Sequence, residues 1–159
     1  NFIKLEELWE IKKAILKVLL ELAKCERYKR AVYLLKSAPG IGILTAIRLI
    51  LEIGDMRRFK RKEEFASFLG LIPSDYSSGD KDRKGHITKQ GSRFLRSSLI
   101  ESSWIAIRRD PALLEKYQRV CNNNGGQGKK AIVAVAKKFA MRIRAVILNN
   151  QPYMFGVIQ

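Results

Sequence analysis

The stretch "LLKSAPGIGILTAIRLILEIGD", residues 34–55, decides the fold. Apolar residues on both sides of Pro-Gly-Ile-Gly (39–42) follow helical spacing, which predicts one amphipathic helix ending near Ser37 and a second over residues 43–53. Proline cannot continue the first helix, and glycine permits backbone conformations with positive φ. Two helices joined in this way are typical of a helix–hairpin–helix motif, which we expect at about residues 31–53.

Such a hairpin suggests a ligand. Its backbone amides and the N-terminus of the following helix point at a phosphate, because unpaired N–H groups and the helix dipole attract anions. We therefore predict that Gly40, Ile41 and Gly42 contact a nucleic-acid backbone. An ordinary helical corner is the alternative interpretation of the same residues.

The segment before the hairpin, residues 2–36, is predicted to form one helix or two. Its apolar residues repeat at three- and four-residue intervals as in a coiled-coil seam: Leu8, Ile11, Ile15, Val18, Leu22 and Cys25. We expect a coiled-coil-like arm over residues 1–30 and a C-terminal domain over residues 31–159. Packing of the arm on its own domain and pairing of the arm with a partner both remain open.

The segments after the hairpin are also helical in pattern. A short helix is predicted to stop at Gly70 and Pro73, and a longer one is expected over residues 90–107, with Thr88 as its N-cap. Its expected buried face consists of Phe94, Leu95, Leu99, Ile105 and Ala106.

Asp110-Pro111 restarts the helix, and a last helix is predicted over about 129–149. That last helix is expected to bury Ile132, Val135, Ala136, Phe139, Ile143, Val146 and Ile147 and to expose Lys130, Lys137, Lys138 and Arg142. No segment alternates convincingly as a strand does, so the sequence predicts an all-α fold.

The 159-residue chain carries a formal net charge of +16 and is 47% hydrophobic. It can bury a core, and so large an excess of charge indicates a polyanionic partner, most commonly nucleic acid. An anionic membrane is the rival, but no run of about 18 uncharged apolar residues is present to span one. The two cysteines, Cys25 and Cys121, are expected to be reduced, and a single histidine leaves no Cys/His metal cluster, so no metal ligand is predicted.

The positive charge is concentrated in two segments, one before and one after the serines at 77 and 78. The residues that we predict to bind the nucleic-acid backbone there are Arg57, Arg58 and Lys62 in the first segment and Lys81, Arg83, Lys84, Lys89, Arg93 and Arg96 in the second. A merely solvated surface is the alternative for both.

Ser77-Ser78-Gly79 places two hydroxyls on a glycine turn among these cations. A serine nucleophile needs a base or a charged environment, and His86 is the one imidazole in the chain. The nucleophile motif of the α/β-hydrolases, Gly-x-Ser-x-Gly, is absent. Cations around a hydroxyl would hold a phosphodiester and stabilise the charge that grows during phosphoryl transfer. The alternative is a serine turn that only orders its loop.

At this point the chain resembles a known family. The segments "SAPGIGILTAIRLILEIGDMRRF", "FASFLGLIPSDYSSGD", "GHITKQGSRFLRSSLIESSW" and "GKKAIVAVAKKFAMRIRAVILNNQPY" are similar, in order and spacing, to the C-terminal domain of transposases of the insertion sequence one-ten family. The resemblance covers roughly residues 30–153.

The resemblance implies a function. In this family the serine directly before the glycine is the nucleophile, which is Ser78 here, and Ser77 is its neighbour. An N-terminal RuvC-like domain with a DEDD set of acids would hold Mg²⁺, and an element-encoded bridge RNA would pair with donor and target DNA. None of those acids is in this chain, which starts at Asn1 and is expected to be the C-terminal part of a longer protein. The fragment alone is therefore expected to be inactive.

Two competing interpretations remain at the level of sequence. The chain is a non-catalytic helix–hairpin–helix module that binds DNA or RNA, or it is an assembly part whose helical arm drives homo-oligomerisation. The resemblance implies a prokaryotic protein of the cytoplasm that associates with the nucleoid.

Overall fold

The computed structural model describes residues 2–75, 84–87 and 91–156 of the chain. In chain order the elements are α1 (Phe2–Lys24), α2 (Glu26–Lys36), α3 (Ile43–Ile53), the 3-10 helix η1 (Met56–Arg58), α4 (Lys62–Phe68), β1 (Pro73–Asp75), β2 (Lys84–Ile87), α5 (Arg93–Ala106), α6 (Pro111–Asn123) and α7 (Gly128–Leu148). The predicted all-α class is confirmed.

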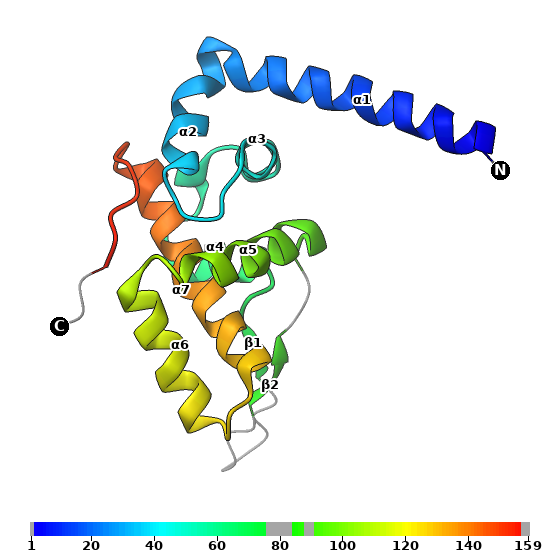
Figure 1. The fold of residues 1–159 in the computed structure, drawn as a ribbon. Helices are drawn as coiled ribbons and strands as arrows, with labels where there is room; N and C mark the ends of the chain where they lie inside the picture. Colours follow the sequence, from blue (N-terminus) through cyan, green and yellow to red (C-terminus); the bar gives the residue numbers. More distant parts are fainter. Residues whose placement is uncertain (1, 76–83, 88–90, 157–159) are drawn as a thin grey trace.

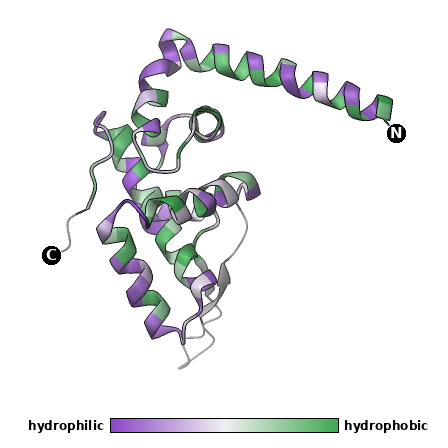
Figure 2. Ribbon diagram, in the orientation of Figure 1, coloured by the Kyte–Doolittle hydropathy of each residue, from purple (hydrophilic) through white to green (hydrophobic). Residues whose placement is uncertain are grey.

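The long helix α1 projects from the rest of the molecule as an arm (Figure 1). The helix ends because Cys25, the N-cap of α2, has a non-helical ψ of 143°. Ala23 is its one buried residue, while Leu19 and Leu22 are partly buried against the core. Hydrophobic residues nevertheless continue along the whole arm (Figure 2). Residues 2–36 therefore form two helices, and much of the first one's apolar surface is exposed.

The two helices predicted on either side of residues 39–42 are present. Helix α2 ends at Lys36 with Ser37 as its C-cap, and α3 spans the predicted residues 43–53. Gly54 closes α3 with a φ of +64°, a conformation that glycine adopts without strain. The two helices pack on each other.

A two-stranded antiparallel sheet is an addition to the predicted fold. Strand β1 pairs with β2 so that Pro73 lies opposite Ile87 and Asp75 opposite Lys84. Strands of three and four residues are too short to show an alternating pattern, and Gly, Lys and Asp are uncommon in strands.

The hydrophobic core surrounds α7, which packs against α2, α4, α5 and α6. The largest fully buried side chains are Phe65, Phe139, Leu35, Ile47, Leu49, Leu69, Leu71, Leu95, Leu99, Leu113, Ile143 and Val135. The predicted buried face of α7 is confirmed, except that Ile147 is only half-buried. Arg142, predicted to face solvent, instead binds the buried carboxylate of Asp110.

Two helix starts are fixed by side chains. Helix α6 begins at Pro111, and the Asp110 carboxylate accepts a hydrogen bond from the N–H of Leu113, as expected for an N-cap followed by proline. Helix α5 begins later than predicted, because Ser92 rather than Thr88 caps it by accepting from the N–H of Leu95.

The predicted buried face of α5 is correct for its leucines and for Ala106. Phe94 and Ile105, however, are 37% and 45% exposed. The guanidinium of Arg48 covers the ring of Phe94, so that this aromatic side chain packs against a cation at the surface.

Candidate nucleic-acid interface

The hairpin between α2 and α3 is pressed against α5. Gly40 has a φ of +80°, and a Cβ built on it would lie 2.7 Å from the carbonyl oxygen and 2.9 Å from the Cα of Ser102. The Ser102 hydroxyl donates a hydrogen bond to the Gly40 carbonyl at 2.9 Å. Glycine is therefore needed at position 40 both for the backbone conformation and for the close approach of α5.

The other two hairpin residues differ in exposure. Ile41 is only 5% exposed and belongs to the core, and its N–H donates to the carbonyl of Ala38 at 3.2 Å. Gly42 is exposed, adopts an extended conformation as the N-cap of α3, and has no atom within 4 Å of a Cβ built on it.

The first turn of α3 is open to an anion. Within the described ranges no side chain caps this helix, so its first N–H groups lack an intrahelical acceptor and attract negative charge. Beside the hairpin lies a cleft of about 380 Å³, whose lining residues are Gly40, Thr45, Ser97, Ser98, Glu101, Ser102, Trp104, Ile105 and Arg108. The cleft combines hydroxyl donors with a single cation, Arg108.

The basic segment after α3 is held in place by α7. Arg57 and Arg58 lie exposed on η1, whose N-cap Asp55 accepts from the N–H of Arg57 at 2.9 Å. The guanidinium of Arg144 donates to the carbonyl of Phe59 at 2.7 Å and so fastens the segment to the core. Lys62 is exposed at the start of α4.

Arg58 also packs on aromatic rings. Its guanidinium carbon lies 4.6 Å from the ring centre of Phe59 and 4.8 Å from that of Phe68. These rings support the guanidinium while leaving it at the surface, which is a suitable arrangement for contact with a phosphate.

The two predicted arginines of α5 occupy different environments. Arg93 is exposed at the first residue of the helix. Arg96 is only 9% exposed, and its guanidinium donates to the carbonyl of Gly91 at 3.5 Å. A Cβ at Gly91 would overlap the carbonyl oxygen of Phe68. The chain therefore enters α5 pressed against the end of α4, and Arg96 binds this entry.

A polar network joins α3 to the start of α5. The Ser92 hydroxyl donates to the carboxylate of Glu52 at 2.5 Å, and Arg48 donates to the same carboxylate at 2.8 Å. Burial opposes ionisation of Glu52, but the hydrogen bonds from Ser92 and Arg48 outweigh it and lower the pKa of this carboxyl. Arg48 and Glu52 were not predicted to belong to the site. Their spacing of four residues, which is typical of an ion pair on one helix face, was the available signal in the sequence.

The predicted nucleophile lies outside the described residues, as do Ser77, Gly79, Lys81, Arg83, Thr88 and Lys89. Lys84 and His86 belong to β2, whose pairing with β1 places Asp75 opposite Lys84. The roles predicted for these side chains therefore stay predictions.

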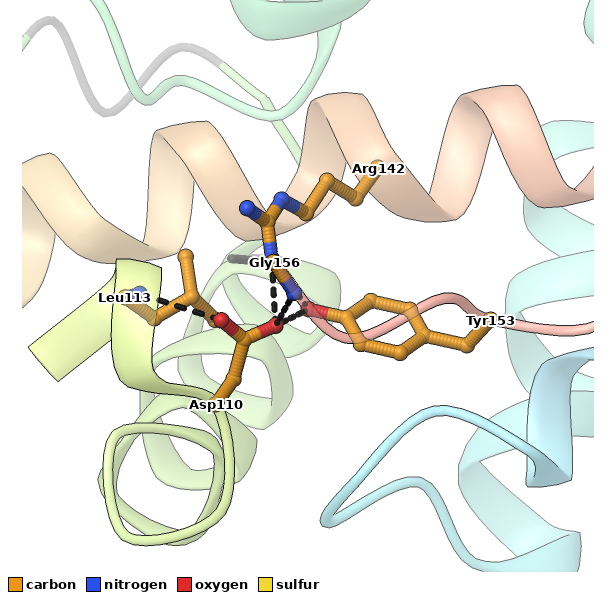
Figure 3. Close-up of polar contacts among 5 residues, drawn as sticks. All are labelled: Asp110, Leu113, Arg142, Tyr153 and Gly156. Carbon is orange, nitrogen blue, oxygen red and sulfur yellow. Dashed lines mark hydrogen bonds and ion pairs between the residues drawn. The ribbon is translucent and has the colours of Figure 1, made fainter. Parts of the chain in front are cut away.

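The most buried polar cluster of the described residues is centred on Asp110 (Figure 3). One of its carboxylate oxygens accepts from the Tyr153 hydroxyl at 2.6 Å, from the Arg142 guanidinium and from the N–H of Gly156 at 3.3 Å. Burial and the bond to Asp110 raise the pKa of Tyr153 above its usual range. Because the carboxylate is paired and hydrogen-bonded throughout, we interpret the cluster as a clamp for the C-terminal segment.

Two classes of site are absent from the described ranges. No group of three or more His, Cys, Asp or Glu there is arranged to hold a metal ion. Nor does any helix in these ranges combine the length and the apolar character needed to cross a membrane.

Residues 32–118 match the model of the Transposase IS116/IS110/IS902 family. The chain is 32% identical over 124 residues to the transposase for insertion sequence element IS1111A of Coxiella burnetii, a match that covers 76% of this chain and 34% of that protein. It is 34% identical over 122 residues to the pilin gene-inverting protein of Moraxella bovis, covering 76% and 38% of the two chains. The chain thus spans about a third of the length of these relatives.

Proposed function

Because this chain belongs to the Transposase IS116/IS110/IS902 family, we propose that it is the C-terminal catalytic domain of an insertion-sequence transposase and supplies Ser78 as the nucleophile for DNA cleavage. The observation that carries the proposal is the family match over residues 32–118, which includes Ser77, Ser78 and Gly79. The name of the pilin gene-inverting relative says that it inverts a gene. That activity agrees with the proposed role of this chain in DNA recombination.

The proposed reaction is a transesterification at phosphorus. The Ser78 oxygen forms a bond to a DNA phosphorus, and the bond from that phosphorus to one deoxyribose oxygen breaks. The serine proton passes to solvent or a base, and the released deoxyribose oxygen takes up a proton. The number of phosphoester bonds is conserved, so a second strand's hydroxyl can reverse the step and complete recombination without an external energy source.

Phosphoryl transfer of this kind commonly uses Mg²⁺, which neutralises charge on the phosphate. The described acidic residues of this chain do not gather into a ligand set. We therefore place that ion on an N-terminal RuvC-like domain of the full-length protein. A bridge RNA is the proposed guide, as the resemblance to the family implies.

The phosphate contacts that we propose come from two described regions. One is the open N-terminus of α3 with the backbone of residues 40–42, and the other is the basic segment with Arg57, Arg58 and Lys62. Both are held by the core, through Ser102 and Arg144 respectively. Contacts of this kind position a duplex but carry no sequence information directly.

We propose that α1 pairs with the same helix of a second copy. Its seam residues Leu8, Ile11, Ile15 and Val18 are 63%, 55%, 55% and 61% exposed. A row of large apolar side chains at heptad spacing is stabilised when a second helix covers it. The protein would act in the prokaryotic cytoplasm, associated with the nucleoid.

The test uses the full-length protein with its guide RNA and DNA substrate. Ser78→Ala is expected to abolish strand cleavage and the covalent adduct while DNA and RNA binding stay almost unchanged. Ser77→Ala is the matched control and is expected to retain cleavage.

Retained cleavage in Ser78→Ala with loss in Ser77→Ala would assign the reaction to the other hydroxyl. Retained cleavage in both variants would contradict a serine nucleophile and leave the helix–hairpin–helix binding module as the function.

A further inference from the structure

A second cleft of the molecule, which shares no lining residue with the one beside the hairpin, lies between α4, α6 and α7. Its volume is about 420 Å³, and its lining residues are Lys62, Glu63, Lys116, Ala134, Lys137, Lys138 and Met141. It thus contains four lysines and one acid. We call this cleft the lysine groove.

The lysines of the groove converge only because of the fold. Lys62 starts α4, Lys116 lies in the first half of α6, and Lys137 and Lys138 lie in the middle of α7. Helix α7 packs directly against both of the other helices. The sequence analysis assigned Lys137 and Lys138 to a solvated face and did not single out Lys116.

Within the described part of the chain, no ion pair neutralises the lysines of the groove. Across the described ranges, no carboxylate lies within ion-pairing distance of these four ammonium groups. Lys116 and Lys137 are half-buried. Burial lowers the pKa of Lys116, and the positive charges of Arg119, Lys138 and Lys137 lower it further.

Clustering of this kind costs free energy. Like charges repel, and partial burial removes part of the water that would otherwise screen them. An anion placed between the lysines would offset this repulsion. Lysine presents a compact charge with three donors, which suits single contacts to the oxygens of successive phosphates.

We propose that the lysine groove binds the phosphodiester backbone of nucleic acid, as a contact that shares Lys62 with the basic segment of residues 57–62 and adds Lys116, Lys137 and Lys138 to it. The inference rests on the proposed function only in taking nucleic acid as the partner of this chain. The other lining residues are Ala134, Met141 and a single acid, Glu63, so the lysines define the groove's preference for anions.

The first test is protection of lysine amines in the unmodified 159-residue chain. An acetylating ester is applied with and without a DNA duplex of random sequence, and the modified lysines are quantified by mass spectrometry. We expect acetylation of Lys116, Lys137 and Lys138 to fall several-fold when the duplex is bound. The exposed lysines Lys4 and Lys17 of α1 serve as internal controls and are expected to react unchanged.

The same experiment with an RNA duplex of equal length identifies the source of the phosphodiester. Protection by RNA alone would assign the groove to RNA, and protection by both would assign it to either backbone. No protection by either duplex, or equal protection of the groove and of α1, would overturn the proposal.

A second test compares two variants with the same loss of charge. Lys116→Gln with Lys137→Gln removes two groove contacts, whereas Lys4→Gln with Lys17→Gln removes two charges from α1. The slope of log Kobs against log salt for duplex DNA should fall by about 0.9 for each phosphate contact that is lost. We expect that change in the groove variant and a smaller one in the control. Equal changes would mean that only the bulk charge matters.

These results are separable from the proposed function. A Ser78 adduct without protection of the groove would reject the groove and keep the transposase mechanism. Protection without an adduct would keep the groove and favour a binding module. Circular dichroism of both variants shows that any loss of binding is not a loss of fold.

Discussion

Replacement of the two hairpin glycines separates the fold of the hairpin from its proposed role. In Gly40→Ala the new residue must hold a φ of +80°, and a Cβ there meets backbone atoms of Ser102 at 2.7 Å and 2.9 Å. A left-handed backbone costs an ordinary residue about 1–2 kcal/mol. Relief of the overlap moves the hairpin off α5 and endangers the hydrogen bond from Ser102 to the Gly40 carbonyl, which is worth about 1 kcal/mol.

The total for Gly40→Ala is about 2–3 kcal/mol of the free energy of unfolding. In a chain of this length, each kcal/mol lowers Tm by about 2–4 °C, so we expect Tm to fall by roughly 4–12 °C. Differential scanning calorimetry or thermal circular dichroism measures it.

Gly42→Ala is the matched control. Its φ is −84° and no atom lies within 4 Å of the added Cβ. We therefore expect stability within about 0.5 kcal/mol of the original, because the poorer N-cap that Ala makes is offset by the lower conformational entropy of the unfolded chain. The methyl group would, however, stand at the open N-terminus of α3. Affinity for duplex DNA should fall about fivefold, the equivalent of one hydrogen bond of about 1 kcal/mol.

The two variants test different steps of the reasoning. An unchanged Tm in Gly40→Ala would refute the packing of the hairpin on α5. Unchanged DNA affinity in a folded Gly42→Ala would refute the hairpin as a phosphate contact, whatever the function of the rest of the domain.

Three further predictions follow from the other regions. The pKa of Tyr153 is raised, so the folded chain holds the phenol proton to a higher pH than the unfolded chain does, and this contribution to stability is present below pH 10.0 and is lost as pH rises above it. In denaturant titrations at pH 9 to 11, the free energy of unfolding should therefore fall more steeply with pH in the original chain than in Tyr153→Phe. Arg58→Glu with Lys62→Glu should weaken binding to unrelated DNA sequences about equally and lower the slope of log Kobs against log salt by about one unit per lost contact. Binding isotherms of this variant that coincide with those of the original chain at several salt concentrations would contradict this. Leu8→Lys with Ile15→Lys should convert an oligomer to a monomer in sedimentation experiments without lowering Tm of the domain, and an unchanged oligomer would exclude the α1 seam as its interface.

Local signals predicted the hairpin well. Proline and glycine at 39–42 act on the backbone within a few residues, so the end of α2 near Ser37 and the whole of α3 could be placed from the sequence. The restart of the helix at Asp110-Pro111 was predicted for the same reason, since N-caps and first-turn prolines are local preferences.

Contacts between distant segments could not be predicted in this way. Arg142 has a charged side chain of the kind usually found at the surface, but the fold places it against the Asp110 carboxylate, 32 residues away in sequence. Thr88 and Ser92 are equally suitable N-caps, and the choice of Ser92 depends on its bond to Glu52, 40 residues away. The lysine groove likewise exists only through the packing of α4 and α6 on α7.

The predicted site residues fall into three groups in the structure. Gly42, Arg57, Arg58, Lys62 and Arg93 are exposed, whereas Gly40 is half-buried and Ile41 is buried. Arg96 is buried and binds Gly91, which makes it a residue that positions the start of α5 rather than a phosphate contact. Ser78 and its neighbours rest on the family match, because they lie outside the described residues.

The most direct test of the central claim is to locate the atom that DNA becomes attached to. The covalent intermediate that the full-length protein forms with its guide RNA and a DNA substrate is trapped, and its DNA is digested to a short remnant. The peptide of residues 63–81 is then sequenced by tandem mass spectrometry. This peptide contains Ser67, Ser74, Ser77 and Ser78. The account predicts a phosphodiester remnant on Ser78. Attachment at another residue, or efficient strand cleavage with no protein–DNA adduct at all, would contradict it.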